Sequence, residues 1–457
     1  MSRPTQASRP TSQRPSNARP NPRRRPATRS NGASAGGNNP GKPIVITKPV
    51  LGEIAADNPF VALGIPEILA QVLAGQGILE PFPIQQATMV DALAQRDVLG
   101  QGRTGSGKTL AFALPLVTSL AANPKPRAAG RPRALVLVPT RELATQVAAV
   151  IEPLAAAVDL RVTTVFGGVS HGPQRSAFAQ GVEIVVACPG RLLDHMQAKD
   201  VTLDRVEITV LDEADHMADQ GFLPIVRKIL DATDSNGQRM LFSATLAGGV
   251  DTLVKRYLDN PVSHAAQVEA PVLLDHHVVV VSEADRPAAI HELAQRGRVV
   301  MFTRTKSRAK QLTRKLETGG INAVEMHGNL SQNARERNLL AFSSGTAKVL
   351  VATDIAARGI HVDDVPLVVH ADPPIEHKAY THRSGRTARA GAAGEVITVA
   401  TPDQVAEVRM LLKKAGVTAT WTGIKVPANS AQPRPASSNR GGSSNYGNRR
   451  PQGSRSR

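Results

Sequence analysis

The chain has 457 residues, a formal net charge of +17, 41% hydrophobic residues and one cysteine, Cys188. A single cysteine excludes an intrachain disulfide, and the lack of an 18-residue apolar run or an apolar N-terminal stretch argues against a membrane span or a secretory signal. The length indicates two domains with tails rather than one domain. We therefore expect a cytoplasmic protein with a monomeric core and no membrane partner.

The net charge lies mainly at the two ends of the sequence. Residues 1–43 contain eight Arg, one Lys and no acid, and residues 426–457 contain six Arg and no acid. The ends thus hold fifteen of the net +17. Both lack the apolar content that offsets ordering entropy, so we predict disordered basic tails. Such tails favour attraction to phosphate, with tails that only keep the protein soluble as the alternative.

Short β-branched runs alternate with helical patterns from about residue 60. They predict strands at 98–99, 134–138, 162–166, 183–187 and 206–211 and, after a pause over 259–276, at 277–281, 298–303, 347–351, 366–370 and 395–400. Helical patterns cover 110–120 and 141–157, the second with Thr140 as N-cap. This alternation predicts an α/β fold with parallel sheets. We place two tandem domains at 44–262 and 277–425, joined by a linker over 263–276.

Residues 102–109 fit the phosphate-binding loop pattern G-x-x-x-x-G-K-[ST] at every fixed position. The loop stands between a predicted strand and a predicted helix, which is the context it requires. Lys108 would reach the β- and γ-phosphates of ATP, and Thr109 would bind Mg²⁺. The residues whose backbone would surround the phosphates are Gly102, Arg103, Thr104, Gly105, Ser106 and Gly107.

The sequence Asp212-Glu213-Ala214-Asp215 directly follows the strand predicted at 206–211. Its acids therefore lie at the carboxyl end of a strand, where α/β sheets bind ligands. We assign Asp212 to Mg²⁺ and Glu213 to positioning the attacking water. An acidic pair that only caps a helix is the alternative.

The segment from His382 to Arg389 contains three Arg and one His in eight residues. Arg386 and Arg389 are three apart and would point the same way on a helix. Such a pair can stabilise charge on a transferred phosphoryl group, with an RNA-binding basic face as the alternative. The chain is thus predicted to hydrolyse ATP with the catalytic residues Lys108, Asp212, Glu213, Arg386 and Arg389.

Together these motifs resemble those of the DEAD-box RNA helicases over roughly residues 58–425. The resemblance implies two RecA-like domains. The segment from Gly77 to Gln85 resembles the family's Q motif, which implies that Gln85 reads adenine. Phe60 stands where the family places an aromatic that stacks on the base, and Gly359 falls in a segment that resembles motif V.

The resemblance also implies contacts with the RNA backbone. The residues concerned are Thr140, Arg141, Gly167, Gly168, Gly190 and Arg191 in the first domain, and Thr305, Arg335, Thr353 and Arg358 in the second. Ser243-Ala244-Thr245 resembles the motif that links the nucleotide site to RNA through Asp215, and His382 belongs to the same coupling group.

Three residues depart from the family's pattern. Cys188 stands where Thr is usual, which replaces a hydroxyl by a weak S–H donor. His361 replaces an Asp expected to contact the ATP ribose, a role that Asp363 or Asp364 would have to take over. Phe82 replaces a Thr, which alters packing more than chemistry.

The resemblance implies an ATP-dependent RNA helicase that closes two domains on one RNA strand and so separates short duplexes or remodels RNA–protein complexes. RNA would be recognised through phosphates and 2′-hydroxyls. Two alternatives stay open: an ATP-switched RNA clamp or annealing chaperone that works mainly through its tails, and a DNA-translocating helicase, against which Gln85 and Asp215 weigh. Length and lack of targeting suit a bacterial cytoplasmic member with ribonucleoprotein or RNA-decay partners.

Overall fold

The computed structural model describes residues 46–102, 105–246, 248–265, 274–354, 365–388 and 393–423. The basic tails predicted at 1–43 and 426–457 lie outside these residues. So do Arg103, Thr104, Arg358, Gly359, His361 and Arg389.

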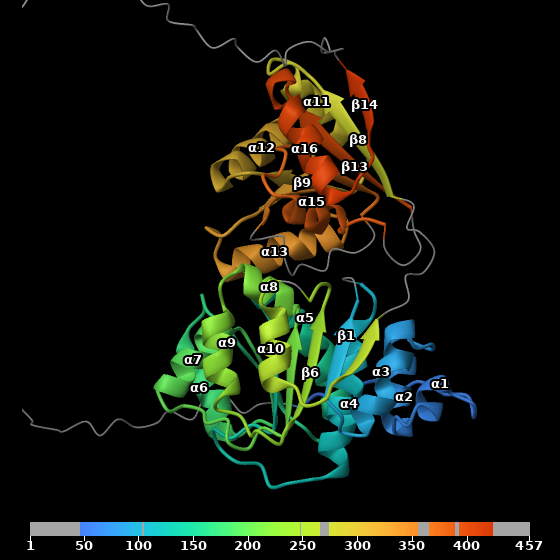
Figure 1. Cartoon of the computed structure of the whole chain (residues 1–457), viewed down its shortest axis with the longest axis vertical. Coiled ribbons are helices and arrows are strands. Elements are labelled where there is room, and N and C mark those ends of the chain that lie inside the picture. Colours follow the sequence, from blue (N-terminus) through green and yellow to red (C-terminus); the bar gives the residue numbers. More distant parts are fainter. Residues whose placement is uncertain are drawn as a thin grey trace, which may run out of the picture. The chain divides into compact units, whose positions relative to one another are not determined.

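The first sheet has seven parallel strands in the order β3-β4-β2-β5-β6-β1-β7 (Figure 1). The strands are β1 Val98–Gln101, β2 Ala134–Leu137, β3 Val162–Val165, β4 Ile184–Ala187, β5 Ile208–Asp212, β6 Gln238–Ser243 and β7 Val262–Ala265. Every residue of β2, β4, β5 and β6 is buried, as expected for parallel strands covered on both faces.

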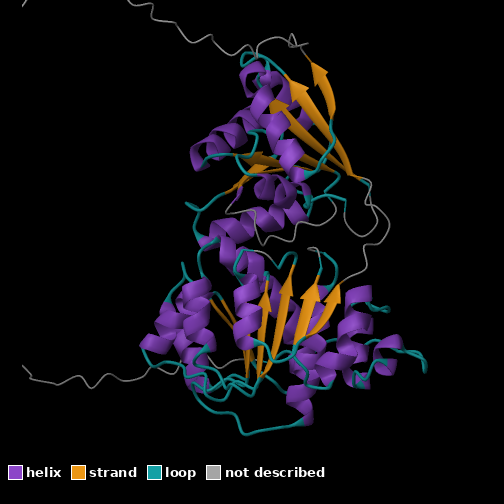
Figure 2. Cartoon of the chain, in the orientation of Figure 1, coloured by secondary structure: helices purple, strands orange, loops and turns teal. Residues whose placement is uncertain are grey.

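Helices cover both faces of this sheet (Figure 2). They are α1 Pro59–Ala62, α2 Glu67–Gly75, α3 Pro83–Leu93, α4 Lys108–Ala122, α5 Arg141–Ala157, α6 His171–Gln180, α7 Pro189–Gln197, α8 Ala214–Asp219, α9 Leu223–Leu230 and α10 Val250–Tyr257. Strand β2 shows the resulting alternation: Ala134 and Val136 belong to the apolar cluster of α1–α5, whereas Leu135 and Leu137 belong to that of α6–α10.

The second sheet also has seven parallel strands, in the order β10-β11-β9-β12-β13-β8-β14. Its strands are β8 Leu274–Val280, β9 Val299–Thr303, β10 Ala323–Met326, β11 Val349–Thr353, β12 Leu367–His370, β13 Gly394–Ala400 and β14 Thr420–Gly423. The helices are α11 Arg286–Ala294, α12 Lys306–Thr318, α13 Gln332–Ser343, α15 His377–Ser384 and α16 Val405–Ala415, with a 3₁₀ turn, η1, at Pro402–Gln404.

The structure confirms the predicted α/β alternation and corrects it at several points. Helix α5 has the predicted bounds, and the predicted strands are present within a few residues. Strands β6, β7, β10 and β14 were not expected. Strand β7 pairs with β1, and β8 begins at Leu274, so the connecting segment is shorter than the linker expected over 263–276.

Candidate nucleotide and RNA site

The order of the first sheet brings most of the predicted motifs to one edge. In a parallel sheet the carboxyl ends of all strands meet at the same edge. The phosphate loop follows β1, Ser243 ends β6 and Asp212 ends β5, and these three strands are neighbours. The segments expected to contact RNA follow the next three strands, β2, β4 and β3. The nucleotide motifs therefore occupy one half of the edge and the RNA motifs the other.

The phosphate loop ends at Lys108, the first residue of α4. Gly107, the N-cap, has φ 87°, a left-handed conformation that glycine adopts without strain. The Lys108 side chain is 6% exposed, and its Nζ donates a hydrogen bond to the Gly102 carbonyl at 2.7 Å. The ammonium group is thus turned back onto the loop, where a phosphate would have to take over this contact.

Asp212 and Glu213 lie where β5 passes into α8. Asp212 is 3% exposed, and its Oδ1 accepts a hydrogen bond from the Glu213 N–H at 3.0 Å. Glu213 has φ 54° and ψ 48°, a left-handed backbone that costs a non-glycine residue about 1–2 kcal/mol. Its Oε2 lies 3.8 Å from His216 Nδ1. Strain held at a candidate catalytic carboxylate fits a backbone shaped for function.

The donor set fits Mg²⁺. This ion takes few protein ligands, commonly one or two carboxylates, beside phosphate and water oxygens. The nearly buried Asp212 carboxylate and the half-buried Thr109 hydroxyl are hard oxygen donors at the ends of β5 and α4. Within the described ranges, no group of three or more His, Cys, Asp or Glu side chains is arranged for a metal.

Asp215 connects the acidic motif to the segment after β6. Its Oδ2 accepts hydrogen bonds from the Thr245 N–H at 3.0 Å and the Thr245 hydroxyl at 3.1 Å. The Ser243 hydroxyl in turn donates to the Thr245 carbonyl and accepts from the Asp215 N–H. The Ser243 carbonyl accepts a bond from the Gly102 N–H at 3.1 Å. One hydrogen-bonded chain thus runs from the phosphate loop to Asp215.

Gln85 and Phe60, the two residues expected to contact the base, are both buried. Gln85 is fully buried; its Oε1 accepts from the Phe82 N–H, and its Nε2 donates to the Gly107 carbonyl at 2.9 Å. The amide therefore connects the phosphate loop to α3, and its recognition of adenine stays a prediction. Phe60 is 1% exposed and belongs to the apolar core, and its stacking on a base stays a prediction.

Phe82, which was expected to alter packing more than chemistry, lies beside the phosphate loop. It is 47% exposed, and a Cβ built on Gly107 would lie 2.7 Å from its Cδ2. The ring therefore lies against the phosphate loop. An aromatic side chain at this point can be found in the sequence, but its contact with Gly107 follows only from the fold.

The predicted RNA residues of the first domain come together around two glycines. The N–H of Leu143 donates to the Thr140 hydroxyl, which caps α5. A Cβ on Gly168 would overlap the Arg141 guanidinium, and one on Gly167 would lie within 4.0 Å of both Arg141 and Arg191. Arg191 also donates to the Val169 carbonyl at 3.1 Å. Two guanidinium groups thus flank an exposed glycine backbone, an arrangement suited to phosphate.

Cys188 precedes α7 near this group. Burial, with the Glu142 carboxylate second, raises the pKa of the Cys188 thiol to about 12. The side chain therefore stays a neutral thiol at physiological pH. Gly190, on the same helix, has no atom within 4 Å of the position where a Cβ would stand.

The described RNA residues predicted for the second domain end or follow three neighbouring strands, β10, β11 and β9, while Arg358 lies outside the described residues. Thr305 follows β9 and caps α12, where its hydroxyl accepts from the Arg308 N–H. Thr353 ends β11 and is 8% exposed. Arg335, on α13 after β10, donates from Nε to Glu142 Oε1 at 2.7 Å.

The segment that carries Arg386 is not the continuous helix that was predicted. Helix α15 ends at Ser384 with Gly385 as its C-cap, and Arg386 lies in the following turn, 7% exposed. Arg386 is therefore not on the helix assumed for it, because Gly385 ends that helix first, and Arg389 lies outside the described residues. The ring of His382, in the last turn of α15, lies 6.1 Å from that of His216.

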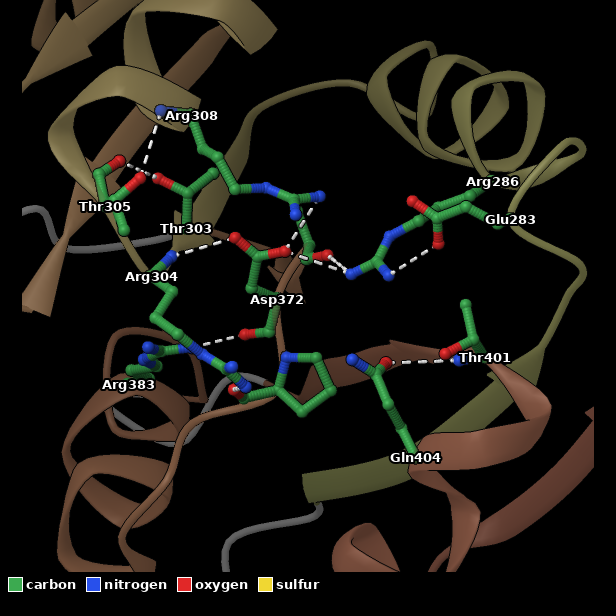
Figure 3. Close-up of polar contacts among 12 residues, drawn as sticks. Glu283, Arg286, Thr303, Arg304, Thr305, Arg308, Asp372, Arg383, Thr401 and Gln404 are labelled. Carbon is green, nitrogen blue, oxygen red and sulfur yellow. Dashed lines mark hydrogen bonds and ion pairs between the residues drawn. The ribbon is translucent and has the colours of Figure 1, made fainter.

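Arg383 and Asp372 were not singled out from the sequence, yet they hold this part of the second domain together. Arg383 is 2% exposed; it makes a paired contact with the Asp354 carboxylate and donates to the Asp372 carbonyl. The Asp372 carboxylate accepts from the Arg304 N–H and contacts Arg286 and Arg308 (Figure 3). The segment that presents Thr305 is thus anchored to a buried acid.

Comparisons with known proteins agree with this geometry. The family model DEAD/DEAH box helicase matches residues 82–253, and the helicase conserved C-terminal domain matches residues 285–391. DEAD-box ATP-dependent RNA helicases 30 and 20 of Arabidopsis thaliana are 36% and 37% identical to the chain over 404 and 367 residues. These matches cover 86% and 78% of this chain and 67% and 73% of the relatives.

A solved structure of S. cerevisiae Dbp5 bound to RNA and ADP BeF3 is similar with a TM-score of 0.68 and 27% identity, over 80% of this chain and 95% of that chain. The predicted fold of two tandem RecA-like domains is thereby confirmed. The relatives named here come from a plant and a fungus, so the expected bacterial origin gains no support. None of the helices that the structure describes has the length and apolar content needed to cross a bilayer.

Substitution of Gly107 by Ala tests the packing of the phosphate loop. The added methyl would lie 2.6 Å from Gln85 Nε2 and 2.7 Å from Phe82 Cδ2 on a left-handed backbone. We expect Gly107→Ala to weaken ATP binding at least about tenfold, the equivalent of roughly 1.4 kcal/mol. Gly221→Ala is the control, since Gly221 has φ 75° with no atom within 4 Å of its Cβ position. Equal ATP affinities of the two variants in a titration would contradict this account.

Thr245→Val tests the link to Asp215. The variant keeps the shape and the N–H of residue 245 but removes the hydroxyl bond to the carboxylate, which is worth about 1.5–3 kcal/mol. We expect RNA stimulation of ATP hydrolysis to fall more than basal hydrolysis, measured as the ratio of rates with and without RNA. Thr233→Val, which removes a hydroxyl bond to the Leu230 carbonyl, should leave the ratio unchanged.

Cys188 should resist alkylation. With a pKa of about 12, the native thiol at pH 8 carries on the order of a thousandfold less thiolate than an ordinary cysteine. We expect slow labelling by iodoacetamide in the native protein and fast labelling in denaturant, where the same cysteine regains its usual pKa. Because the raised pKa favours proton retention in the folded state, it also predicts that stability falls as pH rises from about 9. Cys188 is partly buried, and fast native labelling would show that its thiol is more accessible in solution than in the structure.

Proposed function

Because the chain belongs to the DEAD-box family of ATP-dependent RNA helicases, we propose that it uses ATP to close two RecA-like domains on one RNA strand. It is an RNA-stimulated ATPase and RNA helicase. The observation that carries the proposed coupling is the single edge of the first sheet. There the nucleotide motifs on β1, β6 and β5 stand beside the RNA motifs on β2, β4 and β3.

In the proposed mechanism, the phosphate loop binds ATP and Lys108 exchanges the Gly102 carbonyl for phosphate oxygens. Thr109 and Asp212 would hold Mg²⁺, which supplies charge neutralisation at the phosphates. Glu213 orients the attacking water and accepts its proton. Its left-handed backbone, fixed between β5 and α8, keeps this carboxylate in a defined direction.

We propose that nucleotide binding at the phosphate loop changes the RNA-binding segments through a series of hydrogen bonds. A shift of Gly102 on phosphate binding acts on the Ser243 carbonyl. The Ser243 hydroxyl accepts from the Asp215 N–H, and the Asp215 carboxylate accepts from Thr245. Gln85 reports on the loop in the same way, through Gly107. We propose that Arg386 and Arg389 approach the γ-phosphate from the second domain when the domains close.

The RNA strand is proposed to lie along the flanked glycines of the first domain and the strand ends of the second. Arg141 and Arg191 would contact phosphates beside Gly167 and Gly168. Such contacts carry no base information, so the protein would select RNA through its 2′-hydroxyls rather than its sequence. A cytoplasmic location and partners in ribonucleoprotein assembly or RNA decay stand as further proposals.

Glu213→Gln tests the catalytic assignment. The amide cannot accept a proton, and general-base catalysis typically contributes 10²–10⁴-fold. We expect kcat for ATP hydrolysis to fall by roughly that factor, while RNA binding in the presence of ATP is retained. Glu292→Gln, at an exposed position of α11, is the control and should hydrolyse ATP normally.

The same assay tests the function as a whole. Hydrolysis by the unaltered protein should rise with RNA and not with a DNA of the same sequence. Stimulation by DNA alone would point to a DNA translocase. Strand annealing without ATP-dependent duplex separation would point to the clamp or chaperone instead.

A further inference from the structure

Helix α12 carries an unusual concentration of positive charge on its outer face. Its thirteen residues include five cations and one acid, Glu317. We call the exposed residues on one face of this helix the basic stripe: Ser307, Lys310, Gln311, Arg314, Lys315 and Thr318. In Figure 1, α12 lies along one side of the second domain.

This charge works against the stability of the helix. Lys306, Lys310 and Arg314 are spaced four apart, which puts like charges side by side on the surface. The first turn contains no acid, so Lys306 and Arg308 meet the positive end of the helix dipole without an acid of α12 itself, although Asp372 contacts Arg308. If the only role of this surface were to keep the protein soluble, Glu–Lys pairs at these spacings would make the helix more stable. The retained repulsion therefore indicates an anionic partner.

The cations of the stripe are available for such a partner. Arg308 is engaged by Asp372, and Lys306 donates to the Asn329 side chain. Lys310, Arg314 and Lys315, by contrast, make no ion pair with another residue of the described ranges. These three side chains are also exposed. Two other arginines of the same domain are buried beside an acid: Arg286 contacts Asp372, and Arg383 contacts Asp354.

The position of the stripe points to one polyanion. Thr305, which the proposed function places on the RNA backbone, is the N-cap of α12, so the stripe begins within two residues of it. From Lys306 to Lys315 the helix rises about 14 Å, enough to meet several phosphates of one strand. RNA held at Thr305 is covalently continuous, which gives its flanking phosphates a high effective concentration at the stripe.

We propose that the outer face of α12 is a second RNA-binding surface, which holds phosphates of the strand where it leaves the site at Thr305. This rests on the proposed function. The surface reads no bases and adds affinity for RNA that extends beyond the central site. Its contribution depends on salt, because each neutralised phosphate releases counterions.

The test compares the full chain with Lys310→Gln/Arg314→Gln/Lys315→Gln, which removes three charges with residues of similar helix propensity. Lys348→Gln/Lys413→Gln/Lys414→Gln is the matched control, since it removes three exposed charges elsewhere in the same domain. Two RNA probes are used: a short single strand, and the same strand with an extension on either end. Affinity is measured over a range of salt concentrations, and unfolding temperature is measured for each variant.

We expect the α12 variant to lose the affinity that the extension adds and to lower the slope of log affinity against log salt by roughly 2, at about 0.7 per phosphate contact. The control should keep both, and the α12 variant should unfold at the same temperature or slightly higher. Unchanged slopes, an equal loss in the control, or a lower unfolding temperature would overturn the proposal. Its failure is distinct from that of the proposed function, which is decided by RNA stimulation of ATP hydrolysis in the unaltered protein.

Discussion

The parallel pairing of β6 with both β1 and β5 is the constraint on which the nucleotide site depends. It sets Gln101 beside Ser243 and Asp212 beside Phe242, so the phosphate loop, the segment after β6 and the acidic motif emerge at one level. Gly100 makes this possible, because a Cβ there would lie 2.3 Å from the Phe242 ring. With the strands fixed, the bond from Gly102 to Ser243 continues the ladder into the loop.

Three buried polar side chains at this edge find hydrogen-bond partners in other motifs. Gln85, Ser243 and Asp215 are each less than 9% exposed, and each bonds to the backbone of another motif. A buried hydrogen bond adds only about 0.5–1.5 kcal/mol, but a buried group left without a partner costs more. When a change in one motif breaks such a bond, the partner motif lowers its free energy by rearranging to give its polar group a new partner. This is a physical basis for coupling nucleotide state to the RNA side.

Much of this arrangement could be predicted from sequence, because the patterns that carry it are local. Apolar runs gave most strands, Thr140 marked the start of α5, and the fixed glycines and Lys108 marked the phosphate loop. Contacts between distant segments could not be predicted. The burial of Phe60, the bonds that turn Gln85 toward Gly107, and the anchoring of the Thr305 segment by Asp372 depend on the folded chain. Gly385 ends α15 before Arg386. This glycine is visible in the sequence and could have predicted the helix end, but the prediction considered only the spacing of the arginines.

On the second domain, the burial of a charged side chain decides whether it needs a partner of opposite charge. Where an arginine is buried, as at Arg286 and Arg383, an aspartate meets it, since an unpaired buried charge is costly. Exposed cations need no such partner. Helix α12 carries five cations and one acid, and the repulsion between the cations lowers the stability of the helix. The near-neutral total of residues 44–425 thus conceals a local excess. If RNA binds at Thr305 as proposed, this excess begins within two residues of the bound strand, and the body of the protein then contributes to salt-dependent affinity.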